Sequence, residues 1–427
     1  MGNRLDKSKI GDSMRGRVVL AGVIFIPLIF VCFVLAAAAL RGTALTGQLF
    51  FGDTHDVFMD FYNCLKSAAG RDPYNEINMV QYPPLCELIF YFFGRLLPDG
   101  LVYSDPYGLR ELQSASLAFA LFIFIPIAIS VYAIEEMSEL EIRHKRLLIL
   151  TVLLSSPFLY AFERGNIILY SFAFTLLFIA LRNSGNRFKK EIALIALALA
   201  FAIKIYPAAF GILLLKHKQI KEAVRCAIYG IALFFLPFLG LGGLSRFSLM
   251  IRWLTQRTDV SDTEGLGAKI NFANVIRIYL LKLFGISDQV SWPQIAAIVL
   301  GIILLAAGLC LQKDWMSAAA IALAISGIPS YSYFYVAVFL LIPLILIFNE
   351  KELNSMDISG LALLLIALAP FPVTFMAPER KYSITVLQCI TGSIMLILAI
   401  VIAAVLVKEL ISRVRSVQPL KQDRRQN

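Results

Sequence analysis

The chain of 427 residues is 59% hydrophobic and only 16% charged, with a formal net charge of +10. Soluble domains are nearer half apolar and about a quarter charged, so this composition excludes an ordinary soluble enzyme. Apolar stretches close to the length of a bilayer-spanning helix, about 20 residues, recur along the whole chain. They are continuous rather than alternating at every second residue, so the sequence predicts a polytopic all-α membrane protein and not a barrel.

The apolar stretches predict about twelve membrane spans, within a range of roughly ten to thirteen. The expected spans are residues 18–40, 113–134, 147–162, 167–182, 190–203, 206–216, 224–243, 292–311, 316–328, 333–349, 358–377 and 383–407. Residues 83–97 are apolar but short, and we expect an interfacial or re-entrant segment there. The first apolar run is too long for a signal-peptide core, so it is expected to remain as a membrane anchor.

Basic residues gather in short loops that fall on one side of the predicted bundle, and such loops are typically cytoplasmic. They lie at the N-terminus, 143–146, 182–190, 216–225 and the C-terminal tail. This pattern predicts cytoplasmic termini and two long outer loops, at about 41–112 and 244–291. If residues 83–97 crossed the membrane, 143–146 would lie outside, which fits the charge pattern less well. Orientation and anionic lipid headgroups account for the net charge without a nucleic-acid partner.

The predicted organisation is one integral membrane domain over residues 1–415, followed by a basic cytoplasmic tail at 416–427. The chain shows no internal repeat, P-loop or GxGxxG motif. Its six cysteines lack CxxC spacing and its three histidines form no cluster, so no structural metal site is expected. Cys64 and Cys86 fall in the first outer loop, where an oxidising compartment would permit a disulfide, although free thiols are the favoured expectation.

Several aspartates follow the first apolar run, in "GDTHDVFMDFYNCLKSAAGRDPYNE" (residues 52–76). Asp56 and Asp60 are four residues apart and would share one face of an amphipathic helix at the outer surface. Gly70 and Pro73 are expected to end that helix. Two neighbouring carboxylates raise each other's pKa, which suits a general base that deprotonates a hydroxyl. A solvated acidic loop and a cation-binding transporter vestibule are the alternatives.

Two further polar motifs interrupt apolar runs. "FERGN" (residues 162–166) carries Arg164 and Asn166 as candidates to help bind a lipid phosphate, with a surface turn and local ion pair as the plain alternative. "KIYP" places Lys204 just before Pro207, about a dozen residues from the basic loops on either side. An ammonium at that depth normally faces a cavity or a partner, and a lysine at a helix break can hold a lipid phosphate. A lysine that snorkels to the interface is the alternative.

The remaining candidates are aromatic or basic residues of the outer segments. Arg257 and Lys269, in the second long loop, could contact phosphate or acceptor, or could simply be solvated. Tyr331 and Tyr333 lie near an outer span end, where an aromatic belt competes with sugar stacking as the explanation. The tyrosines expected to contact an acceptor or sugar are Tyr62, Tyr74, Tyr82, Tyr331 and Tyr333.

The order of these motifs resembles that of the GT-C membrane glycosyltransferases. The matching elements are "DVFMDFYNCLKSAAGRDPY", "QYPPLCELIF", "RGN", "KIYP" and "IPSYSYFYVAVFLLIP", within about residues 50–345. The set is similar to glycosyltransferase family 87, the polyprenyl-phosphate-mannose-dependent mannosyltransferases of bacteria. "RGN" and "KIYP" also resemble the catalytic subunit of the first mannosyltransferase of GPI-anchor synthesis.

The resemblance implies roles for individual residues. The family's catalytic aspartate lies some fourteen residues before the Gly of a G-x-x-x-Y turn, which maps onto Asp56 through Gly70 and Tyr74. Asp60 is implied as a helper or substitute, and Lys204 as the group that holds the donor phosphate. Many relatives carry a Trp and a His where this chain has "SYSYFY". No histidine follows His217 here, so Tyr331 or Tyr333 would take over that role or it would be absent.

Together these features predict an inverting glycosyltransferase of the GT-C fold, which moves a sugar from a polyprenyl-phosphate donor to a lipid or glycan acceptor. Mannose is the default sugar, and an arabinofuranosyl donor is the alternative within the fold. The expected location is a bacterial inner membrane with the site facing outside. No cofactor is expected, and a weakly held divalent cation among Asp53, Asp56 and Asp60 stays open. A glycolipid transporter or flippase, a non-catalytic membrane partner and an O-antigen-ligase-like or phosphoglycosyl enzyme are the rival functions.

Overall fold

The computed structural model describes residues 7–39, 56–98, 105–259, 269–286, 290–371 and 385–417. Every regular element in these ranges is a helix, which confirms the all-α class; one isolated bridge pairs Lys269 with Tyr333. The N-terminal half contains α1 (Lys7–Ala39), α3 (Met59–Ala68), α4 (Pro84–Gly94), α5 (Pro106–Leu109), α6 (Gln113–Met137), α7 (Ile142–Leu153), α8 (Ser156–Arg164), α9 (Ile168–Leu181), α10 (Arg187–Ile203), η3 (Tyr206–Gly211) and α11 (Ile212–Lys216). The C-terminal half contains α12 (Ile220–Phe235), η4 (Leu236–Gly240), α13 (Arg246–Asp259), α14 (Phe272–Phe284), α15 (Trp292–Cys310), α16 (Asp314–Gly327), η6 (Phe334–Leu340), α17 (Leu341–Phe348), α18 (Ser355–Leu368) and α19 (Val386–Val417).

Several of these helices are apolar and long enough to cross a bilayer, which indicates an integral membrane protein. Among the described residues five qualify, namely Arg15–Ala36, Gln113–Met137, Ile220–Gly240, Trp292–Cys310 and Val386–Arg415. The pair α7 and α8, bent by 53°, makes a sixth if it is one broken span. The predicted count of twelve is not confirmed, because six further apolar helices have only 10–17 residues. A helix of 14 residues such as α9 covers about 21 Å, less than the hydrocarbon core of a bilayer.

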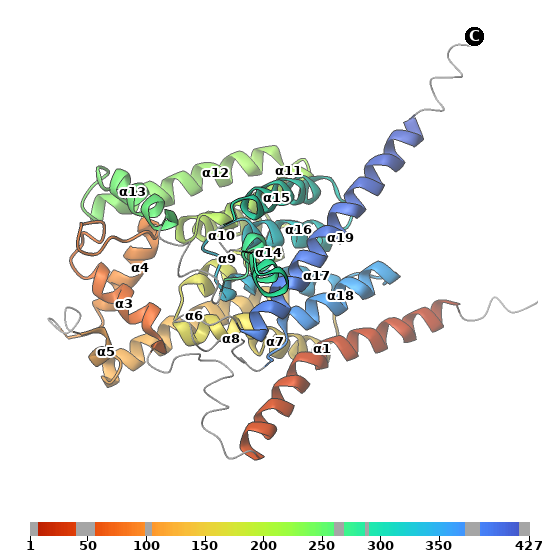
Figure 1. Ribbon diagram of the computed structural model, residues 1–427, viewed down its shortest axis with the longest axis horizontal. Coiled ribbons are helices and arrows are strands. Elements are labelled where there is room, and N and C mark those ends of the chain that lie inside the picture. Colours follow the sequence, from red (N-terminus) through yellow and green to blue (C-terminus); the bar gives the residue numbers. More distant parts are fainter. Residues whose placement is uncertain are drawn as a thin grey trace, which may run out of the picture.

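Helix α9 lies near the centre of the bundle, between α6 and α10. In Figure 1, α3, α4 and α5 lie at one end of the long axis, and the C-terminal end of α19 lies at the other. Helix α9 begins just after Asn166 and ends just before Arg182, and α10 runs back from Arg187 to Lys204. The "RGN" and "KIYP" motifs therefore share one end of the bundle, and the basic turn between α9 and α10 lies at the other.

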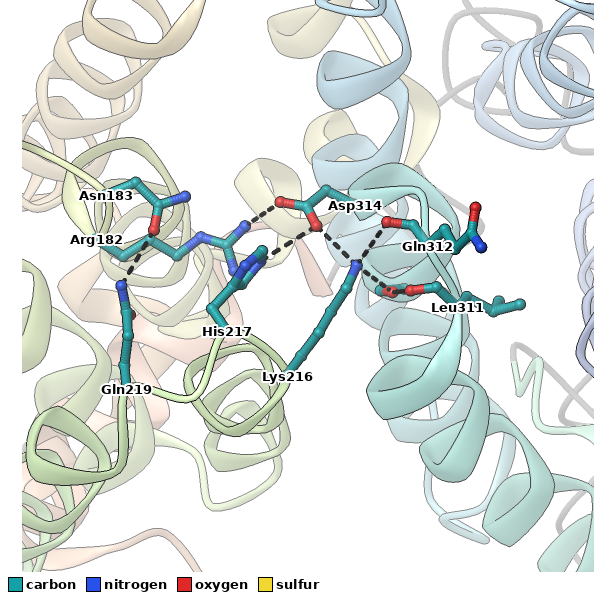
Figure 2. A network of polar contacts seen from close by, with 9 residues as sticks. Arg182, Asn183, Lys216, His217, Gln219, Leu311, Gln312 and Asp314 are labelled. Atoms are coloured by element: carbon teal, nitrogen blue, oxygen red, sulfur yellow. Dashed lines mark hydrogen bonds and ion pairs between the residues drawn. The ribbon is translucent and has the colours of Figure 1, made fainter. Parts of the chain in front are cut away.

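The end of the bundle that carries the basic turn contains a cavity of about 1000 Å³. Its walls come from the ends of α6, α9 and α17 and the starts of α16 and α18, and include Glu136, Arg182, Lys313, Asp314, Asn349 and Glu350. Beside it, Asp314 accepts hydrogen bonds from Arg182 Nη2 and from Lys216 Nζ, each at 2.7 Å (Figure 2). His217 Nε2 lies 3.2 Å from the same carboxylate. One aspartate thus joins the ends of α9 and α11 to the start of α16.

Replacing Asp314 by alanine is expected to destabilise this end of the bundle. The Arg182 side chain is only 2% exposed, so its charge would be left buried without a counter-charge. Breaking such a pair costs about 3 kcal/mol, at the lower end of the usual range because Asp314 itself is partly exposed. Thermal unfolding of the purified protein in detergent measures the effect. Glu409→Ala, which breaks an exposed pair with Arg413, is the control and should cost at most about 0.5 kcal/mol; equal losses in the two variants would contradict the prediction.

Candidate functional site

The site at the other end of the bundle depends on a tight contact between the start of α3 and the turn after α8. Gly165 caps α8 in the left-handed region, with φ +65°. A Cβ on Gly165 would lie 2.9 Å from Phe61 Cβ and 3.2 Å from the Phe58 carbonyl oxygen. The Phe58 N–H donates to the Glu163 carbonyl at 2.7 Å. Only glycine combines this backbone conformation with so close an approach, which sets the neighbouring Arg164 and Asn166 against α3.

Arg164 bridges the two predicted carboxylates. Its Nη1 pairs with Asp56 Oδ2, and its Nη2 pairs with Asp60 Oδ1 at 2.5 Å. Asn166 Nδ2 donates to Asp60 Oδ2 at 2.7 Å. Four sequence-predicted residues are therefore linked by direct contacts. Arg164 pairs with a distant segment, in place of the local ion pair that was the alternative for "FERGN".

The two aspartates differ in how they are held. The expectation that they share a helical face is wrong, because Phe58 has φ 62° and α3 begins only at Met59. Asp56 lies before the helix, and Asp60 lies in its first turn. Both Asp60 oxygens are hydrogen-bonded and its side chain is 19% exposed, whereas Asp56 is 39% exposed. Within the described part of the chain, Asp56 Oδ1 has no hydrogen-bond partner.

Burial raises the pKa of the Asp60 carboxyl from 3.8 to about 6, against the lowering effects of the Asn166 hydrogen bond and the Lys204 charge. Asp60 therefore loses its proton only around pH 6, and is an anion at neutral pH. Arg164 can hold both aspartates in a fixed geometry only while Asp60 is ionised.

Lys204 ends α10, where the chain turns into η3 with Pro207 at its start. The lysine is buried, and its Nζ lies 4.0 Å from the centroid of the Tyr82 ring. Across the described ranges, the ammonium makes no hydrogen bond or ion pair, although it interacts electrostatically with Asp60. A buried cation that contacts only a ring face is poorly compensated. This arrangement can accept an anion.

Four tyrosines form a strip of neighbouring rings that starts near the carboxylates. Tyr331, Tyr333 and Tyr335 are partly exposed and alternate with buried residues. Successive ring centroids are 6.2 Å and 5.8 Å apart, and Tyr160 of α8 stacks on Tyr335 at 6.1 Å. Lys269 Nζ lies 4.6 Å from the centroid of the Tyr331 ring at the far end. Because Tyr160 lies one helical turn before Arg164, the strip leads from the Arg164 cluster to Lys269.

The other predicted site residues lie elsewhere. Tyr62 is buried in the core on α3. Tyr74 is fully buried; its hydroxyl donates to the Tyr82 carbonyl at 2.9 Å, and its own carbonyl accepts from Trp253 Nε1 at 3.0 Å. Neither tyrosine has surface open to a ligand in this conformation. Arg257 lies in α13, but its side chain falls outside the described part of the structure, as does all of Asp53.

Two acidic residues near the site were not among the predicted site residues. Glu87 in α4 is fully buried, accepts a 3.4 Å hydrogen bond from Ser67 Oγ, and leaves Oε1 without a partner in the described structure. Glu163 is buried as well, with Oε2 unpartnered there. Glu87 could have been found, since it is the one acid within the apolar stretch 83–97 and an ionisable group in such a stretch points to function.

The described residues contain no group of three or more His, Cys, Asp or Glu side chains arranged for a metal ion. Asp56 and Asp60 instead have their counter-charge in Arg164. Cys64 and Cys86 are free thiols, both buried. The arrangement therefore offers a carboxylate pair held by an arginine, a buried lysine and an aromatic strip.

The Gly165 contact gives a direct test of how the site is assembled. Gly165→Ala is expected to cost about 2 kcal/mol or more, because it adds a left-handed alanine and a steric clash with α3. Gly185→Ala is the matched control, since a Cβ there meets nothing within 4 Å, and it should change stability by less than about 0.5 kcal/mol. Chemical denaturation of both variants measures the difference. An alanine at 165 that is tolerated as well as the control would show that the close contact is not required.

Comparison with known proteins identifies a family for the chain. The sequence model of glycosyltransferase family 87 matches residues 80–330, which is more than half of the chain and includes the "RGN" and "KIYP" motifs. A search of curated proteins found no match. The family resemblance predicted from the order of the motifs is confirmed, and the chain belongs to glycosyltransferase family 87.

Proposed function

We propose that this glycosyltransferase transfers a sugar, mannose by default, from a polyprenyl-phosphate donor to a hydroxyl of a lipid or glycan acceptor, with inversion. The proposed location is the outer face of a bacterial inner membrane, with both termini in the cytoplasm. The observation that carries the proposal is that the Asp56–Arg164–Asp60 cluster and the buried ammonium of Lys204 lie at the same end of the bundle. Asp60 and Lys204 are close enough there to interact electrostatically.

Asp56 is the proposed general base. It is the more exposed of the two carboxylates, and its Oδ1 has no hydrogen bond within the described residues. The acceptor hydroxyl gives its proton to Asp56 while its oxygen forms a bond to the anomeric carbon. The bond from that carbon to the phosphate oxygen breaks, and the phosphate leaves with the electron pair. Asp60 is a positioning residue, because both of its oxygens are held by Arg164 and Asn166.

Lys204 is the proposed partner of the donor phosphate. The leaving group is already an anion, so it needs charge stabilisation more than a general acid. The compact ammonium of Lys204, which makes no hydrogen bond to any described residue, supplies that charge. Arg164 and Asn166, which were expected to help with the phosphate, are engaged by the carboxylates. The geometry therefore favours positioning roles for both.

The tyrosine strip is the proposed surface for sugar rings. Tyr331 and Tyr333 are part of it, and Tyr160 and Tyr335 extend it towards Arg164. Aromatic faces bury the apolar face of a sugar while its hydroxyls stay solvated. Lys269 lies above the Tyr331 ring, at the end of the strip away from Tyr160, and suits an acceptor group.

A glycolipid transporter remains the rival function, since it would also present polar groups to the membrane surface. Transport needs polar groups along a path through the bundle. Between the two ends of the bundle, α9 and α16 are almost wholly buried and mostly apolar, and the α9 polar residues Ser171 and Thr175 bond to backbone carbonyls. Together with the family assignment, this favours the transferase.

The decisive test of the proposal is transfer of label in nanodiscs. Wild-type protein is given radiolabelled polyprenyl-phosphate mannose and a membrane lipid extract, beside Asp56→Asn and Lys204→Gln. Loss of the base is expected to lower kcat/KM by about 10² to 10⁴-fold, and loss of the ammonium by about 10²-fold. Glu111→Gln, an exposed residue, is the control and should match wild type.

Each other outcome changes a stated part of the proposal. Full transfer by Asp56→Asn moves the base to Asp60. Transfer from an arabinofuranosyl donor but not from the mannosyl donor keeps the mechanism and changes the sugar. No transfer from any donor, together with protein-dependent lipid scrambling, supports the transporter.

The rate of transfer is expected to depend on pH through Asp60. Because its pKa is raised to about 6, Asp60 takes up a proton as pH falls through 6 and stops anchoring Arg164. We expect kcat to fall about tenfold per pH unit below that point. Asp60→Asn should transfer more slowly than wild type, and its pH profile should lack this fall. Glu111→Gln should retain the fall. A wild-type rate that stays flat down to about pH 5 would contradict the assignment.

A further inference from the structure

We propose that Glu87 is a proton-linked counter-charge to Lys204, which at alkaline pH takes up a proton when a phosphodiester binds at that lysine. The inference rests on the proposed function, in which Lys204 receives the donor phosphate, and it assigns a role to a residue outside the mechanism above.

Glu87 lies in the first turn of α4 and is fully buried. Ser67 Oγ donates to its Oε2 at 3.4 Å, and its Oε1 has no hydrogen bond within the described residues. A buried carboxylate with so little support is costly unless a cation compensates it or it binds a proton.

Lys204 is likewise buried and poorly compensated, but its charge is positive. Tyr82, whose ring it contacts at 4.0 Å, precedes α4 by two residues, and α4 packs against α10. The charges of Glu87 and Lys204 act on each other, yet no ion pair joins these two described residues. When Glu87 is ionised, the two residues are separated opposite charges in one buried region, and an anion held by Lys204 would compete with Glu87 for the same positive charge.

The groups that face Glu87 come from three directions. Helix α3 contributes Ser67 and Cys64, and α10 ends with Lys204. Cys86 lies in α4 itself, and Tyr74 lies in the segment between α3 and α4. Burial raises the pKa of Glu87 to about 8, against the lowering effects of Ser67 and Lys204. Thiols and a phenol are neutral in such surroundings. Asp60 of α3 also acts on Lys204, so the charge of this ammonium is balanced by two carboxyl groups, Asp60 and, when it is ionised, Glu87.

Binding of an anion shifts this balance. A phosphodiester monoanion at Lys204 cancels the charge that favours ionised Glu87, so the Glu87 pKa rises further and the carboxylate takes one proton from solvent. Below about pH 8 the carboxyl is already mostly protonated and binding is unhindered. Above it, each binding event must also take up a proton, so affinity falls as pH rises.

The test measures the affinity for methyl farnesyl phosphate, a phosphodiester with no ionisation near neutrality, by titration calorimetry in nanodiscs from about pH 7 to about pH 9.5. We expect wild-type Kd to weaken by up to about tenfold per pH unit above about pH 8. Glu87→Gln should bind as wild type near pH 7 and about fivefold or more tighter than wild type at the alkaline end. Ser67→Ala, which removes a bond that favours the carboxylate, should move the weakening to higher pH.

A pH dependence in Glu87→Gln equal to that of wild type would overturn the inference and assign the titration to Lys204 itself. Lys204→Gln separates the two proposals, because it should abolish binding if Lys204 holds the phosphate. Normal binding by Lys204→Gln would remove the phosphate site of the proposed function as well. If Glu87→Gln fails to fold, an unshifted pH profile in Ser67→Ala still counts against the role of Glu87.

Discussion

The site depends on one guanidinium that holds two carboxylates. Arg164 comes from the end of α8, and Asp56 and Asp60 come from a segment about a hundred residues earlier. The bridge forms because Gly165 has no side chain. The turn after α8 can therefore approach the start of α3 more closely than a Cβ at this position would allow. The same contact exposes Asp56 and holds Asp60 on both oxygens. Two chemically identical residues thereby differ in exposure and in the number of oxygens that are held, which is the basis for proposing Asp56 as the base.

Charge in this site is nearly balanced without a ligand. Arg164 is shared by two aspartates, while the ammonium of Lys204 and the carboxyl of Glu87 remain apart. A lysine that is buried but not neutralised by a direct contact retains binding energy for an anion. At the opposite end of the bundle the buried charges are paired directly, because Asp314 forms ion pairs with both Arg182 and Lys216. Direct pairing there stabilises the fold, and incomplete pairing at the site leaves room for a substrate.

The apolar scaffold explains how the site keeps its geometry. Helices α9 and α10 join the two ends of the bundle, and because α10 runs back along α9, Asn166 and Lys204 lie at the same end. The breaks that shorten the helices also create the site, since Lys204 lies where α10 gives way to a 3₁₀ segment at Pro207. Several helices are consequently too short to be counted as full spans, although their apolar composition is that of membrane segments.

The sequence by itself determined the all-helical membrane class and the family through its motif order. It also marked Asp56, Asp60, Arg164 and Asn166 as separate candidates for the site. Composition and motif spacing are local properties, so these conclusions needed no contact between distant segments. Only the tertiary structure decided that Arg164 pairs with the aspartates, that Asp56 precedes the helix, that Tyr74 lies in the core, and that Glu87 is buried near Lys204. Each of these depends on which segments pack together. A backbone reversal at Phe58 and a left-handed glycine at 165 leave no periodic signal from which such packing could be predicted.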